Sequence, residues 1–516
     1  ISARRTNLDP VLELFNSPNQ TFRYRFYDLN AKISLQLNPK NKIYISGFTG
    51  DDDLRIRDQA LNANFRVNNQ SQLRWGNTTG TINWFSILKQ DLTASTTLTY
   101  TNYNSRLGDA TTRTPTNGEA LNISSSFSSG INDLTLKSNF TKNTRTNRQQ
   151  DFGIFVSRRV FTPNVFSAQN VSTTPDTINT QRFGTFEAGV FYGEKWTLTP
   201  RVKLTYGLRY TLLGVEGKTY QMLEPRASVA YQWNENNIFK LALDRTTQSV
   251  NLLQSSGFGL STDLYIPATA MLRPQISNQI SLGYETSLHQ RQLNLTVESY
   301  LKRQEHLLNF REGVSLFFIG DDPKAFDWER NLAAGQGLLY GFEIGLRKPH
   351  GKLTGWLGYT WAKAIVRFAE LNNGLPFYPF QDRRHDVSGV ASYKIGRRLQ
   401  LSANWVLTTG HPITLPLGYY FAGFNPAALS PVNYYGSRNF SRMPTYHRLD
   451  VSLEIFPKRI KKWSGTWEFG LFNAYNRRNA FNAYVQIANN REGSTLDVAY
   501  SYLLPMIPSI TYHFKF

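Results

Sequence analysis

Apolar and polar residues alternate strictly over the last eight residues of the chain, 509–516. The apolar face of this segment carries Ile510, Tyr512, Phe514 and Phe516. Successive side chains of a strand point to opposite faces, so the pattern predicts a strand with one apolar and one polar face. Taken alone, these eight residues fit an edge strand of a soluble β-sandwich equally well.

The same alternation returns in five further segments, 203–212, 293–298, 340–347, 399–405 and 449–455. Short turns are predicted at 39–42, 198–202, 234–237, 289–291, 349–351 and 396–398. Long connections are predicted at 7–22, 106–119, 165–181, 249–273, 305–337, 365–383 and 413–443. Alternating short and long connections are typical of an up-and-down barrel with tight periplasmic turns and large external loops, and we count about 20 strands.

Composition narrows the class of protein. The 516 residues include 27 Tyr, 34 Phe and 10 Trp, yet the mean hydropathy is low and no run of about 18 apolar residues occurs. A helical membrane protein is thereby excluded, whereas a membrane β-barrel has this composition because only alternate strand residues meet lipid. No linker divides the chain. We therefore predict an all-β protein, a large antiparallel transmembrane β-barrel that takes up residues 1–516 as one domain.

Cysteine content and charge limit the partners. The chain has no cysteine, which excludes disulfides and thiolate metal sites. Its 57 Lys and Arg against 37 Asp and Glu give a net charge of +20, spread along the chain without a basic helix or block. This distribution favours outer-membrane lipid, lipopolysaccharide phosphates and solvated loops over nucleic acid.

Several segments together resemble the barrel of TonB-dependent outer-membrane receptors, particularly those of the Bacteroidetes. Two of the longer ones are Leu223-Glu-Pro-Arg-Ala-Ser-Val-Ala-Tyr231 and Trp467-Glu-Phe-Gly-Leu-Phe-Asn-Ala-Tyr-Asn-Arg-Arg-Asn479. The others are 272–285, 341–347, 381–386, 447–450 and 510–516. The resemblance implies a multi-pass barrel in the outer membrane of a Gram-negative bacterium. It also implies that Phe516 is the aromatic signal read by the outer-membrane assembly machinery.

In this family a plug domain fills the barrel and carries the short box that TonB engages. Neither is visible in this sequence, and Ile1 to Thr6 look like the third strand of the family's barrel. We therefore expect the plug and two strands to precede the chain or to belong to another polypeptide. About 20 strands present and two absent would make the 22 strands of plugged transporters.

The resemblance implies a receptor that binds a ligand at its extracellular loops and imports it with energy transmitted by TonB. The implied partners are the plug, the TonB–ExbB–ExbD complex and, in some members, a surface lipoprotein. Alternatives are a transporter-like barrel acting as a scaffold, an outer-membrane hydrolase and a passive porin. The ligand stays open, because such barrels carry iron chelates, cobalamin, glycans and peptides.

The sequence contains no catalytic or metal-binding motif in a suitable strand–helix context, and we predict no catalytic residue, metal or cofactor. His385 beside Asp382 and Asp386 is the best catalytic arrangement, but a polar strand end below a long loop accounts for it. The acidic clusters 51–53 and 321–329 lack the spacing of a calcium loop and are interpreted as solvated loop acids.

Aromatic residues with a few arginines in two long connections are the candidate ligand contacts, because they can stack on a ligand and bind its charged groups. These candidates are Phe317, Phe318, Trp328, Tyr419, Tyr420, Phe421, Phe424, Tyr434, Tyr435, Arg438 and Arg442. Packing of the loops on each other is the alternative. The polar strand face supplies candidate lumen residues, expected to pair with each other or with a plug. They are Arg209, Glu224, Arg226, Glu285, Glu343, Arg347, Arg448 and Asp450.

Overall fold

The computed structural model describes residues 1–6, 13, 17, 19–61, 65–115, 119–144, 147–169, 182–253, 264–288, 292–314, 328–422, 430–458, 464–490, 493–502 and 504–515. Its first strands are β1 (Ser2–Arg5), β2 (Gln20–Asn38), β3 (Asn41–Leu61), β4 (Phe65–Lys89), β5 (Leu92–Pro115), β6 (Leu121–Asn143), β7 (Arg148–Phe161), β8 (Asn164–Gln169), β9 (Phe183–Thr199), β10 (Val202–Val215), β11 (Lys218–Gln232), β12 (Asn237–Gln248), β13 (Val250–Leu253) and β14 (Leu264–Pro267).

The second half of the chain continues in the same way, with a single three-residue 3-10 segment, η4 (Asn372–Gly374), among its described elements. The strands are β15 (Gln275–Leu288), β16 (Leu293–Phe310), β17 (Leu332–Lys348), β18 (Leu353–Phe368), β19 (His385–Ile395), β20 (Leu399–Thr408), β21 (Pro412–Ile413), β22 (Pro416–Ala422), β23 (Ser430–Tyr435), β24 (Ser441–Arg442), β25 (Tyr446–Ile455), β26 (Ser464–Phe472), β27 (Ala480–Asn490), β28 (Gly493–Tyr502) and β29 (Ile507–Lys515). No helix in the described ranges is long and apolar enough to cross a membrane.

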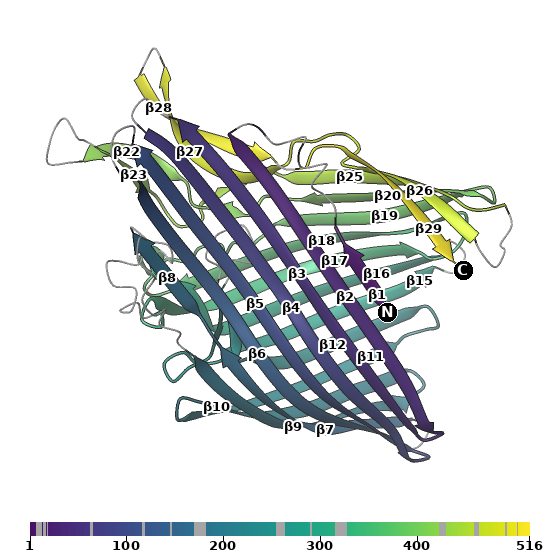
Figure 1. Ribbon diagram of the computed structural model, residues 1–516. Helices are drawn as coiled ribbons and strands as arrows, with labels where there is room; N and C mark the ends of the chain where they lie inside the picture. The colour runs from purple at the N-terminus through teal and green to yellow at the C-terminus, as the bar shows by residue number, and fades with distance from the viewer. Residues whose placement is uncertain are drawn as a thin grey trace.

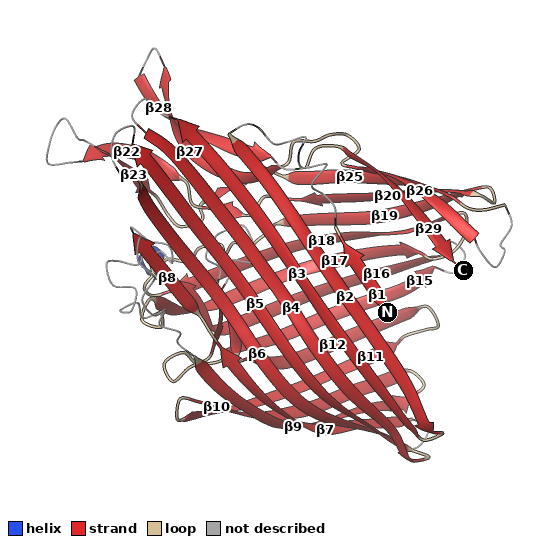
Figure 2. Ribbon diagram, in the orientation of Figure 1, coloured by secondary structure: helices blue, strands red, loops and turns tan. Residues whose placement is uncertain are grey.

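The described residues form one antiparallel sheet of 21 strands and four two-stranded sheets. β7 and β8 pair with successive parts of β6, so they share one position and the 21 strands occupy 20 positions. Figure 1 shows the sheet curved into a barrel, with β2 to β6 crossing in front of β15 to β18, and Figure 2 shows how little lies outside the strands. The predicted all-β barrel of about 20 strands is thus confirmed.

The long connections of the described chain lie at one end of the barrel, where a short turn between β10 and β11 also occurs. Short turns join β2 to β3, β9 to β10 and β19 to β20 at the opposite end. The long connections contain the small pairs β13–β14, β22–β23 and β27–β28, and the last two project beyond the rim at the upper left of Figure 1. The end with long connections is the extracellular end of such a barrel.

The two faces of β10 explain how the sheet meets lipid. Leu208 and Leu212 are 46% and 40% exposed, whereas Thr211 and Leu213, at odd separation from both, are buried. Exposed apolar residues continue at alternate positions of the neighbouring strands, for example Val190 of β9 and Leu223 of β11. The apolar face therefore lies outside, where a membrane barrel contacts hydrocarbon, and the polar face lines the lumen.

The barrel wall is much taller on one side. β3 to β6 are 21, 25, 24 and 23 residues long, whereas β19, β20 and β25 have 11, 10 and 10. The long connection predicted at 106–119 is accordingly wrong over 106–115, which extends β5 and pairs with β4 and β6. Both faces of this extension are polar, because above the membrane no lipid selects apolar side chains and the alternation disappears.

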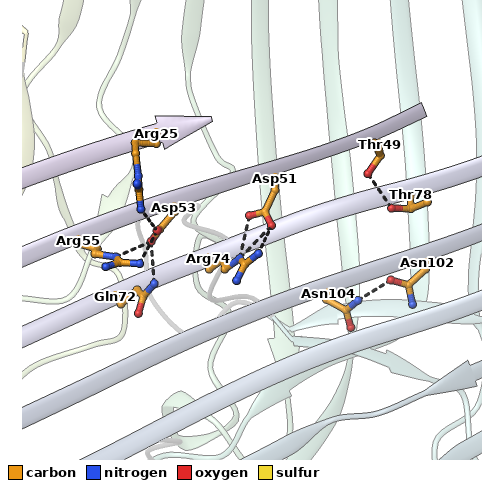
Figure 3. Close-up of polar contacts among 10 residues, drawn as sticks. All are labelled: Arg25, Thr49, Asp51, Asp53, Arg55, Gln72, Arg74, Thr78, Asn102 and Asn104. Atoms are coloured by element: carbon orange, nitrogen blue, oxygen red, sulfur yellow. Dashed lines mark hydrogen bonds and ion pairs between the residues drawn. The ribbon is translucent and has the colours of Figure 1, made fainter. Parts of the chain in front are cut away.

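The acidic cluster 51–53 also departs from expectation. The sequence predicted solvated loop acids, but these residues lie in the middle of β3. Asp51 pairs with Arg74 at 2.6 Å, and Asp52 accepts a hydrogen bond from Tyr24 Oη at 2.6 Å. The carboxylates are thus ion-pairing and hydrogen-bonding groups of adjacent strands, and Figure 3 draws the pairs of Asp51 and Asp53.

The sheet ends at β1 and β29 in the described part of the chain. Residues Ser2 to Arg5 pair with β2, and β29 pairs with β26. No pairing between β1 and β29 occurs among the described residues. Ile510 and Phe514 are exposed on the outer face of β29, and Phe516 lies outside the described residues. The two barrel strands that we expect to precede Ile1 therefore stay a prediction.

Candidate ligand-binding cavity

The connection between β12 and β15 folds into the barrel. Its β13–β14 hairpin packs Tyr265 against Tyr103 of β5, with ring centroids 5.3 Å apart, and the Tyr265 N–H donates to Ser129 Oγ of β6 at 3.2 Å. Tyr103 and Ser129 point inward, since Tyr100 and Leu134, at odd separation on the same strands, are exposed on the outer face. The hairpin consequently lines the lumen near the extracellular end.

A dry cluster holds this hairpin to the neighbouring connection. It contains side chains of β13, β14, the end of β16, the start of β17 and the segments beside them. Its buried members are Leu253, Leu264, Ile266, Leu272, Phe310, Trp328 and Leu332. Trp328 is 4% exposed and meets Phe183 edge-to-face at 5.2 Å. Burial of this many apolar groups gives the loops a core of their own.

Charged residues on the inner wall secure the base of the hairpin. Arg159 of β7 bridges Asp133 of β6 at 2.5 Å and Glu187 of β9 at 2.7 Å. Ser249, which immediately precedes the hairpin, donates to Glu187 Oε2 at 3.0 Å. The network therefore joins three strands to one connection.

A second polar group holds the end of β12, just before the hairpin, to β11. It includes three residues that were predicted to face the lumen. Glu224 of β11 accepts a hydrogen bond from the Thr247 backbone N–H at 2.9 Å. Arg226 and Arg209 approach its other oxygen at 3.7 and 3.9 Å. All three side chains point inward, and the glutamate is buried.

The connections and parts of β15 to β18 line a partly open cavity of about 1240 Å³ at the extracellular end. Its lining combines aromatic side chains, among them Phe377 and Phe380, with an excess of cationic groups. The charged side chains of the lining are Arg311, Arg383 and Arg438 against Glu312 and Asp382, whereas Lys363 lies opposite Tyr340 on the outer face of β18. Three cations and two carboxylates leave a net charge of +1, which suits an anionic ligand.

His411 lies in this lining outside the strands. Its ring packs on Phe380, with centroids 4.1 Å apart. Burial, with a smaller contribution from nearby Arg383, lowers the pKa of His411 to about 4. The imidazole is therefore neutral at pH 7, and the net charge of the cavity does not depend on it.

Arg438 and Arg442, both candidate ligand contacts, also hold loops together. Arg438 Nη2 donates to Asn309 Oδ1 at 3.3 Å, and its guanidinium lies 5.4 Å from the ring centre of Phe377. Burial lowers the pKa of Arg438 from its usual range. Arg442 forms an ion pair with Asp382, whose side chain is 1% exposed. Arg438 lines the cavity, whereas Arg442 is not part of the lining and is paired with Asp382.

The candidate aromatic contacts divide by exposure. Tyr420, Tyr434 and Tyr435 of the β22–β23 pair are 56%, 60% and 51% exposed, Tyr419 is half-buried, and Trp328 belongs to the dry cluster. Only Tyr435 of these five lines the cavity. Phe317, Phe318 and Phe424 lie outside the described residues, and Phe421 is described only as a strand position.

The five other candidate lumen residues also occupy inward positions of their strands. Glu285 pairs with Lys240, and Arg448 pairs with Asp450 at 2.9 Å. Arg347 lies opposite Asn294. Glu343 lies directly opposite Glu298, so two carboxylates face the lumen side by side.

The catalytic arrangement at 382–386 is not assembled. Adjacent strand residues His385 and Asp386 point to opposite faces, and His385 Nδ1 lies 3.0 Å from Tyr359 Oη on the outer face. Asp382 is instead enclosed by Arg384, Arg442 and the Ala364 N–H. Of the acidic cluster 321–329, positions up to 327 lie outside the described residues.

Several site residues were missed from the sequence. The network of Asp133, Arg159, Glu187 and Ser249 spans more than a hundred residues, and no local motif links its members. Period-two alternation in 131–143, 148–161 and 183–199 places the first three on one face, which is the signal that identifies them as lumen residues.

A wide antiparallel barrel with an apolar outer belt, a charged lumen and loops folded over one end defines an outer-membrane receptor or transporter barrel. The family model for the TonB dependent receptor-like β-barrel matches residues 6–477, and the chain belongs to this family. It is accordingly an outer-membrane protein of a family of transporters. No curated protein matches the chain.

Solved structures with the same fold share little sequence with the chain. The ferripyoverdine receptor of Pseudomonas aeruginosa is 11% identical to the chain, with a TM-score of 0.57. The match covers 96% of this chain and 70% of the receptor chain. The ferric preacinetobactin receptor BauA of Acinetobacter baumannii is 10% identical with a TM-score of 0.56, covering 96% and 79%. The ferric-catecholate import receptor Fiu of E. coli is 12% identical with a TM-score of 0.55, covering 96% and 80%.

Proposed function

We propose that this chain is the barrel of a receptor that binds a small anionic ligand at its extracellular end and imports it into the periplasm. A plug domain and the TonB–ExbB–ExbD complex are its expected partners. The observation that carries the proposal is the cavity of about 1240 Å³ with an excess of one cationic group and aromatic walls. Such a lining can stack on a chelate and bind its carboxylate or phenolate oxygens.

Two further observations support this reading. The similar structures are a ferric-catecholate import receptor, a ferripyoverdine receptor and a ferric preacinetobactin receptor, which supports a ferric chelate as our first candidate ligand. Glu298 and Glu343 repel each other across the inner wall unless a cation lies between them. A basic side chain of a plug would supply that cation.

Uptake by cells that carry the complete protein tests the proposal. We expect radiolabelled ferric chelates to accumulate, and accumulation to stop when an uncoupler removes the proton gradient. The double substitution Arg311→Gln and Arg383→Gln should weaken chelate binding, whereas Arg397→Gln in a short turn should not. Uptake that continues without the gradient would indicate a porin, and failure to take up any chelate, cobalamin, glycan or peptide would favour a scaffold.

A further inference from the structure

The short turns at the periplasmic end of the barrel differ in charge. The turns between β4 and β5 and between β11 and β12 carry a carboxylate each, at Asp91 and Glu235. The turns between β17 and β18 and between β19 and β20, at 349–352 and 396–398, carry none. The same holds for 456–458, the described start of the connection between β25 and β26. The exposed cations of these three segments are Lys352, Arg397, Arg398 and Lys458.

These three segments lie side by side at the rim. The Lys394 backbone N–H donates to the Lys352 carbonyl oxygen at 2.9 Å, which joins the first turn to the end of β19. The Phe456 N–H donates to the Arg398 carbonyl oxygen at 2.8 Å, and Arg398 Nε donates to the Phe456 carbonyl oxygen at 3.2 Å. The four cations therefore belong to one continuous surface, which we call the basic arc.

The basic arc lies at the depth of the lipid headgroups. The outward positions of β19 run from His385 to Ile395, and ten residues advance about 25 Å along the axis of a barrel with a tilt of about 40°. This height equals the apolar belt of an outer-membrane barrel, so Ile395 and, on β18, Leu353 mark its periplasmic edge. The cations follow one to three residues beyond the last outward apolar positions, which is at most about 8 Å along the axis. The headgroup layer on each side of the hydrocarbon is roughly 5–7 Å thick.

The cations of the basic arc form no ion pair with a carboxylate in the described part of the chain. The carboxylates of β25 and β26 near this end are Glu454 and Glu468, which lie opposite each other. Both face the lumen, because Trp467 beside Glu468 is exposed on the outer face. Glu454 accepts a hydrogen bond from Gln400 at 3.0 Å, and Glu468 contacts His513 at 3.0 Å. Four like charges on adjacent turns repel each other, so an anion bound between them lowers their electrostatic energy.

Charge and depth together identify the partner of the basic arc. We propose that it binds the phosphate groups of anionic phospholipids in the periplasmic leaflet and selects them over zwitterionic phospholipids. Guanidinium groups bind two oxygens of one phosphate, and the lysines add point charges whose aliphatic stems cover the apolar edge. Turns that end within the headgroup layer do not extend into the periplasm, which favours lipid over a periplasmic polymer or protein. The inference is independent of the ligand that the cavity binds.

Titration of the complete protein in detergent, followed by native mass spectrometry, tests this site. The probes are phosphatidylglycerol, which carries a net negative charge, zwitterionic phosphatidylethanolamine, and an acidic muropeptide. We expect the triple substitution Lys352→Gln, Arg397→Gln and Lys458→Gln to weaken phosphatidylglycerol binding by about tenfold or more, since each basic residue at an anionic leaflet contributes a factor of about five. Binding of phosphatidylethanolamine should not change. Arg398 is retained because it also joins two of the turns.

A charge-matched triple substitution, Arg23→Gln, Arg57→Gln and Arg66→Gln, removes three exposed cations of β2, β3 and β4 towards the opposite end of the barrel. It should leave phosphatidylglycerol binding unchanged. Exchange of lysine for arginine, and of arginine for lysine, at the three substituted positions of the basic arc keeps every charge and should retain the affinity. Equal losses in both glutamine variants, or no loss in the first, would overturn the site. Equal affinity of the unsubstituted protein for the two phospholipids would overturn the selection of anionic headgroups, and tighter binding of the muropeptide would overturn the lipid as the partner.

Discussion

Asp382 binds the guanidinium of Arg442 sixty residues further along the chain, and the carboxylate is almost fully enclosed. Arg384 approaches it at 3.2 Å, and the Ala364 backbone N–H donates to its second oxygen at 2.7 Å. One carboxylate thus ties the end of β18 to the connection before β19 and to the connection before β25. The guanidinium groups of Arg384 and Arg442 both form ion pairs with this carboxylate.

Asp382→Ala should loosen these connections without opening the barrel. Removing the carboxylate leaves two arginines near each other and frees the Ala364 N–H, which we expect to cost about 3 kcal/mol of local stability. Hydrogen exchange at Ala364 and across 436–445 measures this change. Asp382→Asn, which retains an acceptor, should lose less, and Asp386→Asn serves as a control. Unchanged exchange in 436–445 would contradict the bridging role.

Trp328 and Tyr434 were proposed from the sequence as equivalent ligand contacts, and their exposure of 4% and 60% predicts different consequences. Trp328→Ala should cost about 3–5 kcal/mol, because it empties the centre of the dry cluster. Tyr434→Ala should leave stability unchanged, and any loss should appear in ligand affinity. Denaturant unfolding and ligand titration of both variants separate the effects. Equal stability of the two variants would rule out the packing role of Trp328.

The absence of cysteine makes a single engineered cross-link unambiguous. Ser129→Cys with Tyr265→Cys should join the β13–β14 hairpin to the lumen wall, since the Ser129 hydroxyl already lies 3.2 Å from the Tyr265 backbone nitrogen. If the hairpin must move for a ligand to pass, uptake should stop on oxidation and return on reduction. Each single substitution provides the control. Undiminished uptake by the oxidised protein would mean that the hairpin is a fixed part of the wall.

The sequence predicts the fold wherever lipid imposes a pattern. Leu208 and Leu212 alternate with inward residues because one face meets hydrocarbon, so β10 is visible from its sequence. Asp51 and 106–115 lie above the belt, where both faces are polar and a strand resembles a loop. Arg159 could be assigned to a face but not to its partners, because pairing between strands depends on register.

His411 gives the extracellular end a dependence on pH. Its pKa of about 4 in the folded protein is below the usual value near 6.5, so the unfolded loop binds the proton more tightly. Stability of the loop packing should therefore decline as the pH falls from about 6.5 towards 4. Deuterium exchange at the imidazole C2 position reports this pKa directly. Phe380→Leu should raise it, because the ring loses part of its cover. A pKa near 6.5 for His411 in the intact protein would refute the burial.

Substitution of Glu343, which lies opposite Glu298, can show whether a plug contacts this part of the inner wall. The substitution has opposite consequences with and without a plug cation between the two carboxylates. With nothing between them, Glu343→Gln removes a repulsion of about 0.2–1 kcal/mol and should stabilise the wall. With a plug cation bridging the pair, the same substitution removes a charge-assisted contact and should release the plug at lower urea concentration. Proteolysis of the complete receptor during a urea titration distinguishes the two. Arg347→Gln, four residues nearer the short-turn end on the same face of β17, controls for the loss of any lumen charge. Earlier release in Glu343→Gln alone would place the plug against this pair.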